Sequence, residues 1–420
     1  MDRTGSGRPR AREAGVRTGQ LPTGPLDAIT DVAGVLVGHT TLISGEGPLV
    51  PGAGPVRTGV TAIKPHPGNL FHDKVTAAVH VINGFGKSAG FPQVEELGAI
   101  ETPILLTNTL SVGQVSDALV GYMLDQNPDI GLTTVGTVNP VVGECNDGYL
   151  NDIRGRHVKA GHVRAALDAA AGGPVAEGAV GGGTGMTCYG WKGGIGTASR
   201  VVGEGGSGGG AATSPGATVS GAAGFGATVS GGPYTLGALV QANFGSRRHL
   251  TINGVAIGQA LAGWDGSVAG RATPAGAGAG TGAGAGESLE LGSIMTVLAT
   301  DAPLTARQLK RVARRAAGGL ARTGSVFGNG SGDFVIAFTT ANRVPVDAGE
   351  RLLRYERLPD DSQLLSGLFA AAVEAVEEAV LNALFAAGTM AGRDGHVRYG
   401  LPIDEVLNIL RRHAALSEER

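Results

Sequence analysis

Short runs of β-branched and other apolar residues recur along this chain, and Gly, Pro or Asn residues stand between them. Each run has the length of a strand and is bounded by turn-forming residues, a pattern that predicts β-strands buried on one or both faces. Helical patterns lie between the runs, so the sequence predicts a layered α/β fold in which helices cover a core of two sheets. The predicted strands are Val32–Val37, Val60–Ile63, Val75–Ile82, Ile104–Thr107, Leu132–Val142, Ser293–Thr300 and Phe334–Thr340.

Five segments show the apolar spacing of helices. One of them opens with Ser111, whose side chain can cap the first turn, and another follows Thr305 in a capping-box pattern. The longest segment carries Glu374, Glu377 and Glu378, which a bilayer core would penalise, so it predicts an amphipathic surface helix rather than a membrane span. The predicted helices are Ser111–Asp125, Lys159–Ala171, Ala306–Leu320, Leu364–Gly388 and Ile403–His413.

Glycine makes up 74 of the 420 residues, and two low-complexity segments hold many of them. Gly203–Gly232 contains the hexamer GATVSG twice, and Ala272–Gly286 is almost pure Gly, Ala and Thr. Neither segment has enough side chain to offset about 1–2 kcal/mol of backbone entropy per residue, so both are expected to be mobile surface loops. No three-residue glycine period runs through the chain, which excludes a collagen-like fold.

Residues 1–24 are polar and rich in arginine, with no apolar stretch behind them. They predict a flexible tail, and neither a secretory signal nor a membrane anchor. The two cysteines, Cys145 and Cys188, cannot form a disulfide scaffold and fit a compartment in which thiols stay reduced. We therefore expect a cytoplasmic protein.

The charge balance gives no electrostatic reason to expect nucleic acid or an acidic membrane as the main partner. Thirty-three Lys and Arg residues stand against 36 Asp and Glu residues, for a net charge of −3. The basic residues between Arg307 and Arg315 fall on one predicted helix, and we interpret them as a solvated helix face.

Several familiar signatures are incomplete here. Gly84–Ser88 ends like a phosphate-binding loop, but Val81 stands where the first glycine of that motif belongs. Gly181–Gly185 lacks the spacing of a dinucleotide-binding loop, and the G-x-S-x-G match around Ser207 lies in low-complexity sequence. The sequence contains no His-Glu-x-x-His or Cys-x-x-Cys pair to hold zinc. We predict neither a metal nor an organic cofactor.

The junction of Gly292 and Ser293 has a different chemical logic, because the serine starts a predicted strand directly after the second low-complexity segment. If the chain were cut between these residues, Ser293 would carry both a hydroxyl and a free α-amine with an unperturbed pKa near 8. One residue would then supply both nucleophile and general base. Glycine before the cut permits the strained backbone and close approach that attack by the hydroxyl requires.

Five motifs follow one another along the chain: Gly143–Tyr149, Lys192–Arg200, Val240–Gly245, Gly292–Leu304 and Gly330–Asp333. Together and in this order they resemble the self-cleaving L-aminopeptidase/D-esterase family, which includes the β-peptidyl aminopeptidases. The resemblance runs from about Gly24 to the C-terminus, and the two glycine-rich segments are its clear departures.

The resemblance implies an αββα sandwich that is similar in layering to the N-terminal-nucleophile hydrolases but differently connected. It implies one catalytic domain over residues 25–420, cut into a large chain (1–292) and a small chain (293–420) that stay associated. Relatives also suggest a homotetramer.

Carried over motif by motif, the resemblance makes Ser293 the nucleophile. It implies that Asn243 and Tyr149 stabilise the oxyanion and position the substrate, and that Ser331 and Asp333 hydrogen-bond the serine and its amine. Some relatives have glutamate where this chain has Asp333, so this position departs from their pattern.

The residue types also have interpretations of their own. An amide such as Asn243 can donate to a developing oxyanion, but an asparagine before Phe-Gly can also form a turn. Tyr149 can be a packing residue, and Asp333 can cap the turn before its strand. Glu144 is a candidate for holding the free ammonium of an aminopeptidase substrate, and a structural hydrogen bond is its alternative role.

The sequence therefore predicts a hydrolase that removes an amino-terminal residue from small peptides, amides or esters through an acyl-enzyme on Ser293. Two alternatives stay open at this point. One is a self-processing acyltransferase of the ornithine acetyltransferase type, although those enzymes place a threonine after the scissile bond. The other is an unprocessed, non-catalytic scaffold.

Overall fold

The computed structural model describes residues 7–132, 136–203, 232–264, 291–346 and 352–416. The predicted mobile loop at Gly203–Gly232 falls outside this range except for its two end residues. The one at Ala272–Gly286 falls outside it entirely. Among the described residues, no helix is both long enough and apolar enough to cross a membrane.

Two β-sheets form the centre of the molecule. The first has the strand order β1-β2-β5-β6 and the second the order β4-β3-β12-β11-β10-β9. Neighbouring strands are antiparallel except β5 with β6 and β11 with β12. The strands are β1 (Leu36–Ser44), β2 (Val56–Lys64), β3 (Asp73–Gly84), β4 (Ala99–Ile100), β5 (Ile104–Asn108), β6 (Val141–Cys145), β9 (Gly194–Val202), β10 (Tyr234–Asn243), β11 (Leu291–Thr300) and β12 (Gly330–Pro345).

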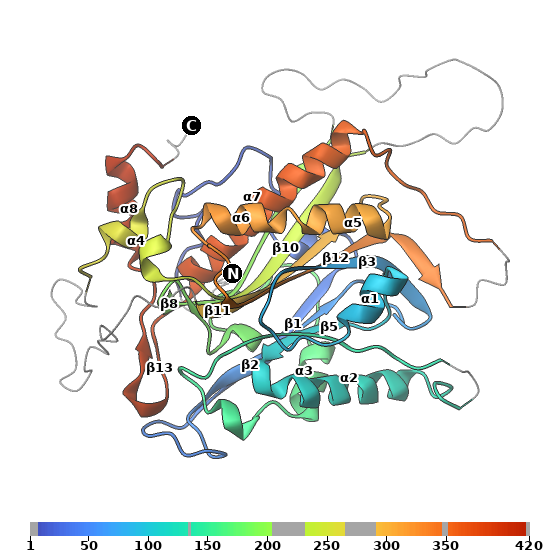
Figure 1. The fold of residues 1–420 in the computed structure, drawn as a ribbon, viewed down its shortest axis with the longest axis horizontal. Coiled ribbons are helices and arrows are strands. Elements are labelled where there is room, and N and C mark those ends of the chain that lie inside the picture. The colour runs from blue at the N-terminus through green and yellow to red at the C-terminus, as the bar shows by residue number, and fades with distance from the viewer. Residues whose placement is uncertain (1–6, 133–135, 204–231, 265–290, 347–351, 417–420) are drawn as a thin grey trace.

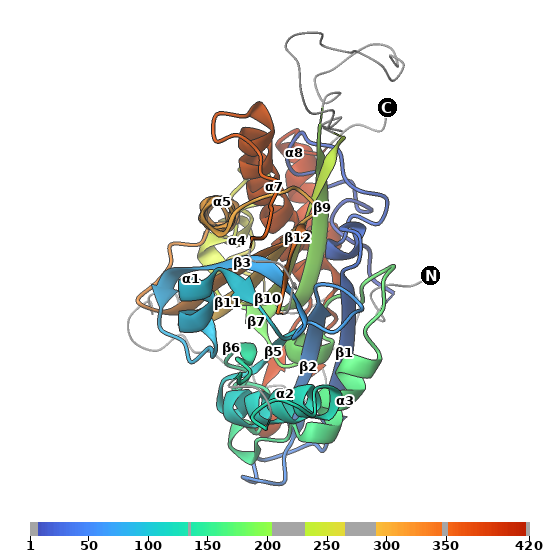
Figure 2. The same cartoon turned by 90° about the vertical axis from the view of Figure 1, so that its right-hand side faces the viewer.

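Helices cover the outer face of each sheet, so the predicted αββα sandwich is confirmed (Figures 1 and 2). Helices α2 (Val112–Gln126) and α3 (Ala160–Asp168) lie on the first sheet. Helices α5 (Ala306–Ala313), α6 (Ala316–Arg322) and α7 (Gln363–Ala386) lie on the second. The smaller elements are α1 (Phe91–Leu97), α4 (Ile257–Ala260), α8 (Ile403–Arg412) and the two-stranded pairs β7 (Thr187–Cys188) with β8 (Trp191–Lys192) and β13 (Met390–Ala391) with β14 (Val397–Arg398).

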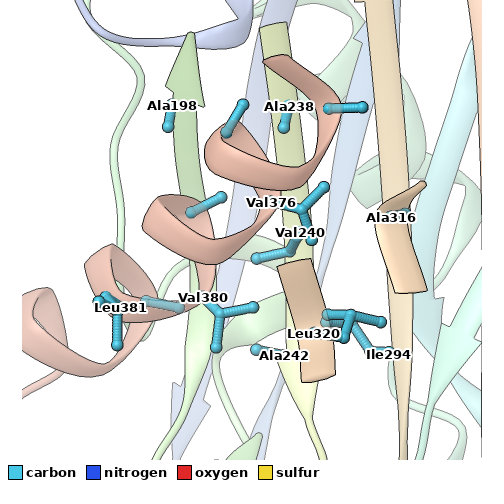
Figure 3. Packing of buried hydrophobic residues seen from close by; sticks show 14 of the residues in the cluster. Ala198, Ala238, Val240, Ala242, Ile294, Ala316, Leu320, Val376, Val380 and Leu381 are labelled. Atoms are coloured by element: carbon cyan, nitrogen blue, oxygen red, sulfur yellow. The ribbon is translucent and has the colours of Figure 1, made fainter. Parts of the chain in front are cut away.

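The second sheet is apolar on both faces, as the short continuous runs predict. Along β11, Ile294 faces the helices, where it joins Val240, Leu320 and Val376 (Figure 3). The next residue, Met295, points the other way into the cluster between the sheets. Full burial of such side chains stabilises the fold by about 1.5–3 kcal/mol each, so this double layer holds β11 firmly in the middle of the molecule.

Most predicted elements occur, with local differences. The Thr305 and Gln308 side chains form the predicted capping box, but the helix that follows ends at Ala313 and a second one begins at Ala316. The side chain of Ser111 does not cap α2. Instead, Asn108 accepts the Ser111 N–H and caps the short 3-10 turn that precedes the helix.

The predicted strand Leu132–Val142 is largely wrong: among its described residues only Val141 and Val142 are in a strand, as the start of β6, and residues 133–135 lie outside the described range. The basic residues of α5 are partly solvated, as predicted, but they also have acidic partners. Arg307 pairs with Asp360, and Lys310 pairs with Glu95. These ion pairs reduce the net positive charge of that face.

The prediction of a flexible N-terminal tail is wrong for residues 7–24. Ala11 and Val16 are fully buried, and the segment runs along α7. Arg12 donates two hydrogen bonds to the carboxylate of Glu378, at 2.8 and 2.5 Å. The polar composition that predicted a tail instead supplies partners for buried charges on another segment.

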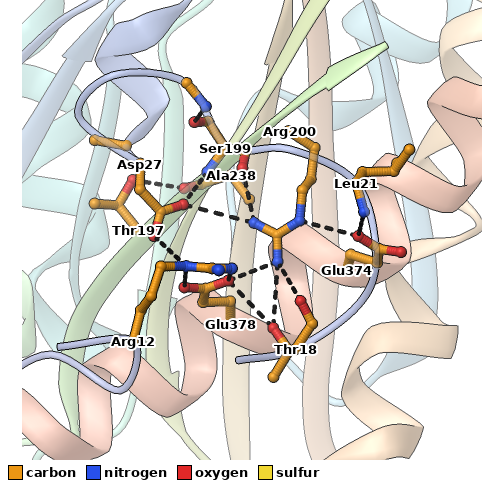
Figure 4. A network of polar contacts seen from close by, with 12 residues as sticks. Arg12, Thr18, Leu21, Asp27, Thr197, Ser199, Arg200, Ala238, Glu374 and Glu378 are labelled. Carbon is orange, nitrogen blue, oxygen red and sulfur yellow. Dashed lines mark hydrogen bonds and ion pairs between the residues drawn. The ribbon is translucent and has the colours of Figure 1, made fainter. Parts of the chain in front are cut away.

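Helix α7 is also not the amphipathic surface helix that its glutamates predict. Glu374, Glu377 and Glu378 are all buried. Arg200 on β9 is fully buried between two of them, at 3.0 Å from Glu374 and 2.6 Å from Glu378 (Figure 4). Buried carboxylates persist when a cation and hydrogen bonds compensate their lost hydration, and here β9 and the N-terminal segment supply both.

Candidate active site

Ser293 lies near the start of β11, where three strands of the second sheet meet. The sequence predicted that Ser293 is the first residue of its strand, but it is the third. Asn243 is directly opposite it on the antiparallel strand β10, and Gly332 is its neighbour on the parallel strand β12. Directly opposed side chains in a sheet have Cβ atoms about 4.5–5.5 Å apart on one face. The register alone therefore brings Ser293 and Asn243 together.

The hydroxyl of Ser293 is held by backbone. Its Oγ accepts a hydrogen bond from the Gly332 N–H at 3.3 Å, and the side chain is almost fully buried. A Cβ atom at Gly332 would lie 2.7 Å from the carbonyl oxygen of Phe85, so only glycine lets the loop after β3 come this close. The loop after β3 thus lies against Gly332, whose N–H binds the nucleophile candidate.

Gly292 has a backbone conformation that favours glycine. Its φ is +144°, in the region that side chains with a Cβ rarely adopt. A Cβ there would also lie 2.2 Å from the carbonyl oxygen of Asn243. Both the torsion and the close approach of β10 require glycine, as the sequence predicted from the chemistry of the junction.

Asn243 is the last residue of β10 and not part of a turn, so its turn-forming interpretation is wrong. Its side-chain Oδ1 accepts the Thr187 N–H at 2.8 Å. Because a backbone N–H can only donate, this contact fixes which end of the amide is oxygen. The Nδ2 group is left as the donor for the space beside Ser293.

Ser331 and Asp333 lie on β12, on either side of Gly332. The Ser331 Oγ donates to the Asp333 carboxylate at 2.6 Å, and both side chains are fully buried. Ser331 is registered with Gly292 and Asp333 with Ile294, so the two residues flank the position opposite Ser293 on the neighbouring strand. Asp333 lies within the strand and does not cap a turn.

Asn83, on β3, is a neighbour of this pair that the sequence did not indicate. Its Nδ2 donates to the carbonyl oxygens of Ser331 and, at 3.1 Å, of Gly328. The contact ties the start of β12 to the end of β3. No motif spacing marks Asn83, because its role depends on the pairing of strands far apart in sequence.

Glu144 is buried at the end of β6 and has the structural hydrogen bonds that its alternative role requires. One carboxylate oxygen accepts the Lys87 N–H at 2.8 Å, and the other accepts the Thr109 hydroxyl. An ionised carboxylate has about four acceptor positions, so these bonds leave room for a substrate ammonium. A Cβ on Gly86 would come within 3.3 Å of the same carboxylate, which places Glu144 beside the loop that lies against Gly332.

Tyr149 packs as an aromatic platform. Its ring stacks on His396 with centroids 4.4 Å apart, and the Arg398 guanidinium lies 3.5 Å from its ring centre. Arg398 in turn donates to the Thr187 hydroxyl at 3.1 Å, and the backbone of Thr187 holds Asn243. Tyr149 thus connects to Asn243 through two residues.

Arg398 and Thr187 are site neighbours that the sequence did not indicate. Burial lowers the pKa of Arg398, and its interaction with the Tyr149 side chain offsets only part of that effect. Arg398 lies on the C-terminal hairpin β13–β14, and the residues around it in the sequence do not predict its contact with Thr187. Among the described residues, no group of three or more His, Cys, Asp or Glu side chains converges to hold a metal ion.

The geometry accords with what sequence and structure comparisons find. The profile of peptidase family S58 matches residues 27–398, nearly the whole chain. The chain belongs to peptidase family S58. As a member, it is a hydrolase of the aminopeptidase type, and the predicted family resemblance is confirmed.

The matches to similar proteins span almost the full length of this chain and of each relative. The β-peptidyl aminopeptidase BapA of Sphingosinicella microcystinivorans is 44% identical over 411 residues, which are 97% of this chain and 93% of that protein. A protein of Pyrococcus horikoshii OT3 is 48% identical with a TM-score of 0.82, covering 97% of this chain and 99% of the other.

The description of a third relative names its fold. The L-aminopeptidase D-Ala-esterase/amidase of Ochrobactrum anthropi, a prototype of the serine aminopeptidases with a variant of the N-terminal-nucleophile hydrolase fold, is 40% identical. Its TM-score is 0.79, and the match covers 98% of this chain and 100% of that one. The layered sheets and helices of this S58 peptidase therefore have the expected fold.

Proposed function

We propose that this S58 peptidase cuts its own chain between Gly292 and Ser293 and then releases amino-terminal residues from small peptides, amides or esters through an acyl-enzyme on Ser293. The observation that carries the proposal is the register of the central sheet. It sets Ser293 opposite Asn243, directly after a glycine with a φ of +144°.

In the processing step, the Ser293 Oγ attacks the carbonyl carbon of Gly292. The bond from that carbon to the Ser293 nitrogen breaks, the hydroxyl proton passes to that nitrogen, and an ester is left between the two residues. Water then hydrolyses the ester, which yields the Gly292 carboxylate and a free α-amine on Ser293. The close approach of Gly292 to β10 supports this step, because it holds the scissile peptide against the strand that carries Asn243.

In turnover, the new α-amine accepts the hydroxyl proton while Ser293 attacks the substrate carbonyl. The amine then returns the proton to the leaving group, and water releases the acyl product. Asn243 donates from Nδ2 to the oxyanion, a contact type whose loss costs about 3–4 kcal/mol of transition-state stabilisation. Tyr149 orients this region through Arg398, and Ser331 with Asp333 binds the amine.

Glu144 holds the ammonium of the substrate. Its carboxylate is buried and already fixed by two donors, so it needs no reorganisation when the substrate arrives. The names of the relatives support a substrate with a free amino terminus, since BapA is a β-peptidyl aminopeptidase and the Ochrobactrum protein an L-aminopeptidase.

After the cut, the two pieces would remain one body. Strand β11 of the small chain is hydrogen-bonded to β10 of the large chain, and β12 of the small chain to β3 of the large chain. Separating them would open the central sheet and both apolar clusters around it. The homotetramer and the cytoplasmic location stay predictions from the sequence.

Denaturing electrophoresis tests processing directly. For a chain of 41.9 kDa, the cut yields pieces of about 29 and 13 kDa, the smaller one beginning Ser-Ile-Met-Thr. The variant S293A should stay at full length and release no amino acid from aminoacyl p-nitroanilides, because it lacks the nucleophile for both steps. Processing that persists in S293A removes Ser293 from the mechanism.

The same protein discriminates the alternatives. Transfer of an acetyl group to ornithine in place of amino acid release would identify an acyltransferase. A single full-length band without hydrolysis would identify a scaffold. The serine after the predicted cut favours the hydrolase, since the acyltransferases carry threonine there.

A further inference from the structure

Lys192 is a buried cation without a carboxylate partner in the described part of the chain. It lies on β8, fully buried, and its ammonium donates to three backbone carbonyls: Gly183 at 3.1 Å, Met186 at 3.0 Å and Gly193 at 2.7 Å. Burial lowers the pKa of this lysine to about 7, against weaker raising by Cys188 and Asp147. Carbonyl dipoles only partly compensate the lost hydration of an ammonium, so the arrangement is costly to the fold.

The Met186 carbonyl belongs to a peptide group whose N–H contacts the candidate active site. The Met186 C=O accepts from the Lys192 ammonium, and the N–H of the same peptide, on Thr187, donates to Asn243 Oδ1 at 2.8 Å. Asn243 is in turn registered opposite Ser293. The series runs from the ammonium through one peptide and one side-chain amide to the space beside the nucleophile.

In this series of hydrogen bonds, the ammonium polarises each following group toward Ser293. A cation on a peptide oxygen draws electron density from the amide and makes its N–H a stronger donor. The Asn243 amide responds in the same way, because its oxygen accepts that bond and its Nδ2 becomes the stronger donor. Chains of hydrogen bonds strengthen one another by about 10–30% per bond in condensed-phase estimates, and a buried charge at one end adds to this.

We infer that Lys192 is a positioning residue for the reaction, acting through the Met186–Thr187 peptide to hold and polarise the Asn243 amide that faces Ser293. The inference rests on the proposed function, because Asn243 must donate to the oxyanion for the effect to matter. The competing role is structural: Lys192 also ties down the 3-10 turn Gly181–Gly183 through the Gly183 carbonyl.

A double-mutant cycle distinguishes the two roles. The variants K192M, N243A and K192M/N243A are purified, and kcat and KM are measured per processed chain, with processing followed by electrophoresis. N243A is expected to lower kcat by about 100- to 1,000-fold, as loss of one oxyanion donor does. K192M is expected to lower kcat by about 10- to 100-fold with KM changed less than about twofold, since the contact acts in the transition state.

The double variant decides the pathway. If Lys192 acts through Asn243, the double variant is no slower than N243A alone by more than about threefold. Losses that multiply, an unchanged kcat in K192M, or a loss confined to KM each overturn the inference. An unchanged kcat in N243A contradicts instead the oxyanion role under the proposed function, so the two failures are distinguishable.

Two further variants keep the test sound. K74M makes the same substitution at a lysine that pairs with Glu101 away from the site, and its kcat should equal that of the wild type. If K192M does not fold, because three buried carbonyls lose their donor, K192Q replaces it in the cycle. Glutamine keeps two N–H donors but no charge, so kcat should still fall, and a wild-type kcat in K192Q contradicts polarisation by the ammonium.

Discussion

Lys192 and Arg200 stand at the two ends of one sequence motif, and both are fully buried cations, yet their surroundings differ in kind. Arg200 is enclosed by the carboxylates of Glu374 and Glu378 and by the backbone of Thr18 (Figure 4). In the described part of the chain, the hydrogen bonds of the Lys192 ammonium all go to backbone carbonyl oxygens. The first cation is paired with carboxylates where it lies, whereas the second donates to backbone dipoles.

The positions of the two residues explain the difference. Strand register places Gly194, just after Lys192, beside Ala242, and Arg200 beside Leu236. At about 3.3 Å per residue, Arg200 is about 20 Å further from the reacting end of the sheet. A positive charge connected by hydrogen bonds to the oxyanion donor strengthens that donor, whereas the same charge far from the site has no such effect. Under the inference drawn above, Lys192 serves the candidate active site and Arg200 serves stability.

The largest expected effect that tests this comparison is on stability. R200M leaves Glu374 and Glu378 without their shared buried cation, and breaking a buried ion pair in this way costs about 3–5 kcal/mol. We expect the free energy of unfolding in denaturant to fall by that amount, with kcat per folded, processed chain unchanged. A kcat loss like that expected for K192M would contradict the separation of the two roles.

Arg164 provides the control for that measurement. It pairs with Asp125 on the surface, where both side chains are more than half exposed. Because exposed pairs are worth about 0–1 kcal/mol, R164M should leave the unfolding free energy nearly unchanged.

A smaller loss of stability is expected from the N-terminal segment. Arg12 donates twice to Glu378, but in R12M that carboxylate keeps Arg200 as its partner. Hydrogen bonds to charged groups are worth about 1.5–3 kcal/mol, and we expect the free energy of unfolding to fall by that amount. If R12M is as unstable as R200M, the two cations contribute equally and the network has no dominant centre.

The smallest expected effect is a change in how stability depends on pH. Burial, and then the charge of Glu378 beside it, raise the pKa of Asp27 to about 7. The native state therefore binds a proton that the unfolded chain releases near pH 4, so this group stabilises the fold at low pH and loses that contribution as pH rises toward 7. D27N, which carries no titrating proton, should weaken the decline in unfolding free energy between pH 5 and 7. An unchanged slope would show that Asp27 is ionised throughout.

The sequence indicated much of the fold because its signals are local. The strand-length apolar runs, the Thr305 capping box and the mixed order of helices and strands each depend on residues close together in the chain. The serine after a glycine at position 292 was also visible, since chemistry at one peptide bond needs only two adjacent residues.

The structure differs wherever a charged residue finds a distant partner. Residues 7–24 look like a tail, and α7 looks like a surface helix, when each is considered alone. They become buried because each covers the charges of the other, although Arg12 and Glu378 are 366 positions apart. The sequence did not indicate Arg398 and Asn83 for the same reason. Their contacts form only when hairpins and strands that are distant in sequence have assembled.

The amino-acid sequence by itself indicated many of the strands and helices, although not β9 and β10, and the reactive junction of Gly292 and Ser293, because alternation, capping and backbone freedom act over a few residues. Only the tertiary structure decided which side chains share an environment. Pairing β10 with β11 set Asn243 opposite Ser293, and the Met186–Thr187 peptide at the start of β7 connected Lys192 to that pair. Burial removes water as a partner, so the neighbours that folding brings near each polar group determine what it does.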